Sequence, residues 1–263
     1  ADTANQNSQN FVAWNWKAGT TGSGTTTGSG TGKAYSYSVS TTAGFSIVKY
    51  IGNGTAGHTI PHHLGVAPKM IIVKSIAAVQ SWIVLPPTSD GYNKDMKLED
   101  TSLLGNSDVW NNTAPTSTVF SVGSNTNMNA NDAPIISYSF AEKQGYSKFG
   151  TYVGNGNADG TFVYTGFKPA FVVIKGAISG NGDAAQSWEL YDNKRLGYNV
   201  DNNNLQPNTA SAESTADRLD IVSNGFKIRI NSDGVNDTNS TYIYMAFAEE
   251  PFVASNFNPA TAR

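Results

Sequence analysis

The chain has 263 residues, 39% of them hydrophobic and only 14% charged, with a net charge of −3 and no cysteine. The charge gives no electrostatic reason to expect a nucleic-acid partner, and the lack of cysteine excludes disulfides and thiolate metal sites. Low charge with abundant glycine is typical of a β-rich extracellular or virion protein rather than of a helical cytosolic enzyme. The apolar runs are also far too short to span a membrane.

The first distinctive segment is an alternating apolar stretch within residues 1–18. It contains Phe11, Val12, Trp14 and Trp16 and reads as the closing strand of an upstream repeat whose other strands are missing. Leaving its large side chains in water would cost roughly 1.5–3 kcal/mol each. We expect this orphan strand either to pack on its own chain or, as the favoured alternative, to act as an assembly strand that completes a sheet in another subunit.

Residues 19–43 are rich in glycine, threonine and serine. Such a composition buries little apolar area to offset the entropy lost on ordering. We therefore predict a flexible linker between the orphan strand and the rest of the chain.

The remainder repeats itself, as residues 44–145 and 146–252. Four segments recur in the same order at spacings of 101 to 107 residues, which is the length of a domain. They are Tyr50–Gly54 with Tyr152–Gly156, Ala67–Lys74 with Lys168–Lys175, Gln80–Trp82 with Gln186–Trp188, and Ile136–Glu142 with Ile243–Glu249. The chain is thus expected to be the C-terminal end of a longer array, or a processed form of it, with 253–263 as its tail.

Strand signals dominate both repeats. Met70–Val73 and Phe171–Ile174 are continuous apolar runs, and Phe226–Ile230 alternates strictly, while Asn/Gly/Asp turns separate the segments. We predict an all-β chain built from two tandem antiparallel β-sandwiches of jelly-roll or lectin-like type. Trp82 and Trp188 stand at equivalent positions and are predicted to lie in the cores.

Three segments also resemble a known family: Gly44–Tyr50, Gly52–Gly54 and His63–Lys69. Together they look like a repeated β-domain found in tail-fibre and other virion proteins of marine tailed phages. Further matches are Tyr146–Gly150, Tyr191–Arg195, Tyr242–Glu249 and the ending Asn258–Arg263, so that the resemblance covers about residues 8–18 and 44–263. It implies a C-terminal fragment of a virion protein without the concanavalin-like domain that usually precedes these repeats.

Metal and catalytic signals are weak. His58, His62 and His63 cluster in one segment, but we interpret them as a solvated hairpin arm rather than a metal site. The Asn/Asp-rich stretches 125–132, 201–204 and 231–237 lack the spacing of a calcium loop and are interpreted as turns. There is no nucleophile motif, and the carboxylates grouped within 90–100 and 213–220 read as solvated side chains. We predict no catalytic residues, no metal and no cofactor.

Aromatic residues in polar loops are the best candidates for binding. Tyr92, Trp110 and Tyr198 lie beside amides and carboxylates, the combination that stacks on a sugar ring and takes its hydroxyls. The competing interpretation is that these rings cover the ends of the sandwiches.

These observations predict a non-enzymatic structural and adhesive protein of an extracellular virion. It would be a tail fibre or related appendage that forms homo-oligomers, contacts other virion proteins and binds host surface glycans. One alternative is a carbohydrate-degrading phage depolymerase domain. Another is a bacterial surface or filament subunit assembled by strand exchange.

Overall fold

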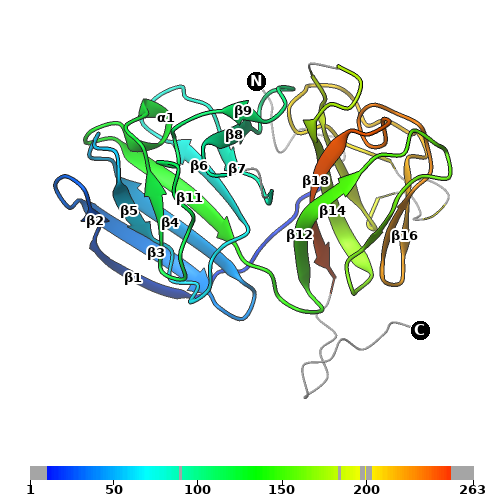
Figure 1. The fold of residues 1–263 in the computed structure, drawn as a ribbon. Coiled ribbons are helices and arrows are strands. Elements are labelled where there is room, and N and C mark those ends of the chain that lie inside the picture. The colour runs from blue at the N-terminus through cyan, green and yellow to red at the C-terminus, as the bar shows by residue number, and fades with distance from the viewer. Residues whose placement is uncertain (1–10, 89–90, 183–184, 196–198, 200–202, 250–263) are drawn as a thin grey trace.

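The structure is a computed structural model that describes residues 11–88, 91–182, 185–195, 199 and 203–249. It is an all-β fold of antiparallel sheets, with a single short helix, α1 (Thr126–Asn129), in the described part. Two β-sandwiches lie side by side (Figure 1). No helix among the described residues is long and apolar enough to cross a membrane.

The first sandwich has a large and a small sheet. In spatial order, the large sheet contains β1 (Thr20–Thr25), β3 (Ala34–Ser40), β4 (Phe45–Ile51), β11 (Pro134–Phe140), β6 (Met70–Ser75), β7 (Ile83–Leu85), β8 (Lys94–Lys97) and β9 (Gly105–Asn106). The small sheet contains β10 (Val119–Val122), β5 (His58–Pro61) and β2 (Thr27–Gly28). Their facing side chains, such as Val48, Ile71 and Phe120, form one buried core.

The second sandwich is smaller. Its four-stranded sheet contains β12 (Ser147–Val153), β18 (Thr241–Ala248), β14 (Pro169–Ile178) and β15 (Trp188–Asp192). Its three-stranded sheet contains β13 (Phe162–Tyr164), β17 (Gly225–Ile228) and β16 (Leu219–Val222). Val172, Phe226 and Tyr244 lie in the core between the two.

The two sandwiches share a strand order. The neighbours β4-β11-β6-β7 of the first correspond to β12-β18-β14-β15 of the second. In each sandwich a buried tyrosine on the first of these four strands, β4 or β12, donates a hydrogen bond to a loop carbonyl. Tyr50 Oη donates to Met128 O at 2.7 Å, and Tyr152 Oη donates to Val235 O at 2.7 Å. This agreement is what a duplicated domain would produce, and the tandem repeat itself stays a prediction.

The expectation of a flexible linker at residues 19–43 is wrong, because this segment forms β1, β2 and β3. The glycines that suggested flexibility are packing sites. Gly22 and Gly24 lie opposite Tyr37 and Tyr35, and a Cβ on either glycine would come within 2.6 and 2.9 Å of those side chains. The tyrosine side chains of β3 thus fill the space above the glycines of β1 and cover this edge of the sheet. The apolar area that the glycines lack is supplied by these two tyrosines of the same segment.

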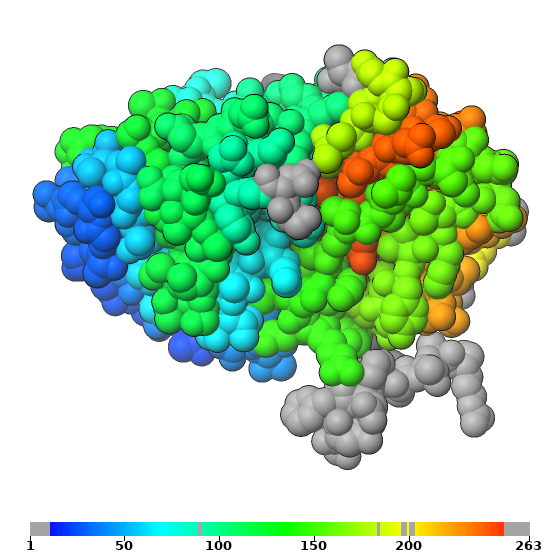
Figure 2. Space-filling view, viewed as in Figure 1, coloured from blue at the N-terminus to red at the C-terminus, as the bar shows by residue number. Residues whose placement is uncertain are grey.

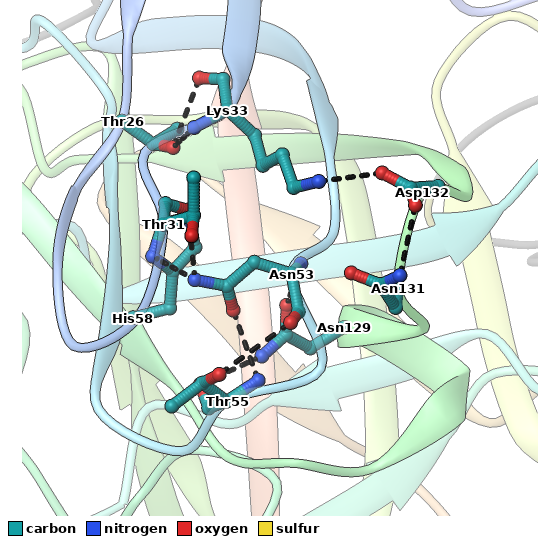
Figure 3. Close-up of polar contacts among 9 residues, drawn as sticks. All are labelled: Thr26, Thr31, Lys33, Asn53, Thr55, His58, Asn129, Asn131 and Asp132. Atoms are coloured by element: carbon teal, nitrogen blue, oxygen red, sulfur yellow. Dashed lines mark hydrogen bonds and ion pairs between the residues drawn. The ribbon is translucent and has the colours of Figure 1, made fainter.

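A buried polar network holds the same segment in place (Figure 3). Asn53 Nδ2 donates to Ser29 O at 2.9 Å and to Thr31 O at 3.1 Å, and it lies 2.9 Å from His58 Nδ1. Lys33 Nζ pairs with Asp132 at 2.5 Å. His58 is therefore a buried member of this network and not part of a solvated arm.

We expect the free energy of unfolding to depend on pH because of the three histidines. Burial holds the pKa of His58, His62 and His63 below the ordinary value of about 6.5. The unfolded chain therefore binds these protons at higher pH than the folded chain. The free energy of unfolding should be at its full value above about pH 6.5 and fall as the pH drops from there to the lowered pKa values of the folded state.

Thermal melting in a series of buffers from about pH 7.5 to about pH 5.5 measures this effect, in a window above most carboxylate titrations. A His62→Asn variant should melt with a shallower pH dependence than the parent. A melting temperature of the parent that stays constant over the whole window would contradict the prediction.

A third apolar cluster joins the sandwiches at what we call the junction. The outer face of the first large sheet brings Phe45, Met70 and Phe140 against Phe171 and Phe247 of the second sandwich. The space-filling view shows the two sandwiches in contact here (Figure 2). The junction thus contributes a core of its own in addition to the two sandwich interiors.

The orphan-strand prediction requires correction, because residues 11–19 lie outside any strand. The indole of Trp16 contacts the rings of Phe140, Phe171 and Phe247 with centroid distances of 6.2, 5.2 and 5.3 Å, and Trp14 lies 5.7 Å from Phe171. Of the two alternatives, packing on its own chain is the one this structure has. Phe11 and Val12 remain exposed.

A candidate glycan-binding face

Two aromatic side chains project into solvent from the small sheet of the second sandwich. Phe162 and Tyr164 on β13 are 45% and 62% exposed, whereas Val163 between them is buried in the core. Residues two apart in a strand share a face. The two rings therefore stand next to each other on the outer side of a sheet whose inner side is packed.

The neighbouring strand lies close to the Phe162 ring. Gly225 of β17 lies opposite Tyr164, and a Cβ there would lie 2.0 Å from Val163 O and 3.2 Å from the Phe162 ring. A larger residue would therefore displace the strand and the ring. Glycine at this position lets the Phe162 ring lie close against β17.

Charged groups border the aromatic pair. Lys227 lies opposite Phe162, and its Nζ pairs with Asp159 at 2.7 Å. On the next strand Asp220 lies opposite Lys227 and pairs with Arg229 Nε at 3.3 Å. The hydrogen bond from Lys227 lowers the pKa of Asp159, so this carboxylate stays ionised.

This combination suits a sugar. An aromatic ring stacks on the apolar C–H face of a pyranose, and charged or hydroxyl groups at its rim exchange hydrogen bonds with the sugar hydroxyls. In the first sandwich the corresponding strand β5 carries Thr59 and Pro61 at the outward positions. The aromatic pair is thus a feature of the second sandwich alone.

The binding residues predicted from the sequence are not brought together. Trp110 is wrong as a binding residue: it is 1% exposed and lies in the core of the first sandwich, with its ring 6.1 Å from Phe120. Asn111 and Asn112 that follow it have φ of 52° and 44°, a left-handed turn that carries the polar residues outward while the indole points in. Tyr92 is half-buried against the same core, and Tyr198 lies outside the described residues.

The sequence does contain a signal for the aromatic face. Phe162, Val163 and Tyr164 alternate in size and aromaticity, which predicts a strand with two different faces. It does not say which face is buried, because all three side chains are apolar. That choice depends on the sheet that packs against the strand.

Two of the grouped carboxylates make structural contacts. Glu213 pairs with the guanidinium of Arg195, and Glu99 accepts a hydrogen bond from the main-chain N of Trp82 at 2.9 Å. In the described part of the chain, no group of three or more His, Cys, Asp or Glu residues is arranged to hold a metal ion. The contacts of Glu99 and Glu213 hold the loops that carry them.

One buried polar network was not foreseen. Glu189 is 2% exposed, and it receives hydrogen bonds from Asn204 and from Gln206, the latter at 2.9 Å, with Arg218 Nη1 at 3.5 Å. Burial raises the pKa of Glu189. The corresponding residue of the first sandwich is Ile83, so this network distinguishes the second core from the first.

Comparison with known proteins gives one family. A family model described as "Domain of unknown function (DUF7483)" matches residues 1–251. No curated protein and no solved structure matches the chain. The matched region takes in the N-terminal segment and both sandwiches together. The chain therefore belongs to this family.

Proposed function

We propose that this member of the family is a non-enzymatic adhesive module of a virion appendage such as a tail fibre, and that it contacts surface glycans through Phe162 and Tyr164. The observation that carries the proposal is the exposure of two neighbouring aromatic rings on a strand whose other face is packed. Exposed apolar groups rimmed by charge mark interaction sites. A rigid strand also holds the rings in place before the ligand arrives, which lowers the entropy lost on binding.

The virion assignment rests on the resemblance of segments such as Gly44–Tyr50 to phage virion β-domains. The weakly charged, glycine- and asparagine-rich composition supports it. A depolymerase would need two carboxyl groups about 5–10 Å apart across a sugar-binding cleft. Glu213 and Asp220 are instead paired with Arg195 and Arg229, which favours the binding function over the enzymatic one.

A glycan array followed by titration of the best ligand tests this function. Tyr164→Ala should weaken binding at least about tenfold, equivalent to about 1.4 kcal/mol, because the stacking surface is lost. Phe162→Ala should weaken it to a similar degree. Neither variant should change the melting temperature much, since both side chains are largely exposed.

Two control variants locate the effect. Thr59→Ala changes the corresponding outward position of the first sandwich, and Tyr92→Ala removes the aromatic residue that the sequence singled out. Both should bind as the parent does. Binding that survives the loss of both Phe162 and Tyr164, or that is lost in Tyr92→Ala, would show that the site is elsewhere.

A further inference from the structure

The junction contains a set of hydrogen bonds that the first sandwich supplies to the second. Trp188 Nε1 donates to Lys97 O at 2.9 Å. The main-chain N of Gln186 and the ammonium of Lys175 both donate to Thr101 O, each at 2.8 Å. All the acceptors here are main-chain carbonyls of residues 97–101.

The first sandwich carries the same three donors. Lys74 Nζ bonds Gln80 O, just as Lys175 Nζ bonds Gln186 O, and it lies 5.6 Å from the centre of the Trp82 ring. Neither the indole N–H of Trp82 nor the main-chain N–H of Gln80 has an acceptor among the residues that the structure describes. Trp82 is correspondingly partly exposed, whereas Trp188 is 1% exposed.

An exposed apolar turn lies beside these free donors. Residues 76–79, Ile-Ala-Ala-Val, are all exposed, with Ile76 at 52% and Val79 fully in solvent. Four consecutive exposed apolar residues are unusual unless they bind something. In the second sandwich the residue corresponding to Ile76 is Ala177, which is 3% exposed and accepts a hydrogen bond from Leu104 N at 3.0 Å. We call the side chains of Lys74, Ile76, Val79 and Trp82, with the Gln80 main chain, the docking patch.

The second sandwich carries a counterpart of residues 97–101, in which the Gln206 carbonyl accepts from Thr209 N at 3.1 Å and keeps a second lone pair for another donor. Asn208 Oδ1 accepts from Trp188 N at 2.9 Å, as Glu99 Oε2 does from Trp82 N. Leu205 forms a β-bridge with Leu190, just as Met96 pairs with Val84 at the corresponding place in the first sandwich. In this alignment the carbonyl of Gln206 corresponds to that of Lys97, and the carbonyl of Ala210 to that of Thr101. Residues 209–213 are exposed.

We propose that residues 206–211 of one copy dock on the docking patch of a second copy and repeat the hydrogen bonds of the junction between molecules. Because the junction's acceptors are main-chain carbonyls, the different side chains of 206–211 do not prevent the same hydrogen bonds. Each copy then offers one segment 206–211, which supplies carbonyl acceptors, and one docking patch, which supplies hydrogen-bond donors. Such a head-to-tail contact closes into a ring or grows into a fibre, depending on the rotation between copies.

Engineered disulfides test the contact, because the natural chain has no cysteine. Within the junction, Ser102 bridges Ala185 as neighbouring strand residues. The corresponding positions across the proposed contact are Ser211 and Val79. The double variant Val79→Cys, Ser211→Cys should form a ladder of covalent dimers and larger species on non-reducing gels under mild oxidation. Reduction should collapse the ladder to monomer.

Three controls make the result specific. Ser102→Cys with Ala185→Cys should give an intramolecular disulfide and no ladder, which verifies that the junction geometry accepts the bond. Val66→Cys with Ser211→Cys pairs residues 206–211 with an exposed residue outside the docking patch and should give no more than background crosslinking. Adding Ile76→Asp to the Val79→Cys, Ser211→Cys pair should suppress the ladder at least fivefold while leaving the melting temperature unchanged.

Three outcomes would overturn the proposal. They are crosslinking no stronger than in the Val66→Cys control, a ladder insensitive to Ile76→Asp, and an intramolecular disulfide between positions 79 and 211.

Discussion

Replacing Trp188 by alanine should lower the free energy of unfolding by about 3–5 kcal/mol, the range for a large aromatic side chain removed from a core. Trp188 is 1% exposed, packs in the junction cluster and donates its indole N–H to Lys97 O. The substitution leaves a cavity and an unsatisfied carbonyl at the same place. Chemical denaturation measures the change.

Trp82 provides the matched control, because it aligns with Trp188 in the predicted repeat and follows the same Gln-Ser pair. Its side chain is partly exposed and belongs to none of the buried clusters, so the prediction of a second core tryptophan is wrong. In the isolated monomer, Trp82→Ala should cost clearly less than Trp188→Ala. Equal losses for the two variants would contradict the assignment of Trp188 to a buried junction.

Replacing both Trp14 and Trp16 by alanine should cost about 2–4 kcal/mol, less than two buried tryptophans would, because both indoles are partly exposed. These rings link Phe140 of the first sandwich with Phe171 and Phe247 of the second. Their loss should weaken the junction more than either sandwich interior. Calorimetry should then show one cooperative transition separating into two.

A Phe11→Ala, Val12→Ala double variant is the control for this prediction. These neighbours are 55% and 36% exposed, and their removal should change the stability by no more than about 0.5 kcal/mol. If the tryptophan variant melts as the parent does while its assembly is lost, residues 11–18 serve the intersubunit contact that the sequence favoured.

The core strands could be predicted from short-range patterns. Met70–Val73 and Phe171–Ile174 are apolar throughout. Each lies in a strand with two covered faces: one face packs in the sandwich interior, and the other packs in the junction. The alternation of Phe226–Ile228 likewise marks a strand with one core face. Such patterns are local, so they survive without knowledge of the partner strand.

The misplaced residues depended on contacts that composition does not show. Residues 19–43 looked like a linker because they are rich in glycine, yet Tyr35 and Tyr37 of the same segment cover those glycines, and Asn53 anchors the loop between them. Trp110 looked exposed because its neighbours are polar, although a left-handed turn at Asn111 separates it from them.

The sequence by itself determined the fold class, the antiparallel strands and the positions of most turns, because apolar periodicity and Gly/Asn chemistry act within a few residues. Tertiary structure alone decided which face of each strand meets solvent. Phe162 and Trp188 are both aromatic residues of strands, but one faces solvent and the other faces the junction. Burial depends on what packs above a side chain, and here that packing comes from a second sheet and from an N-terminal segment more than a hundred residues away.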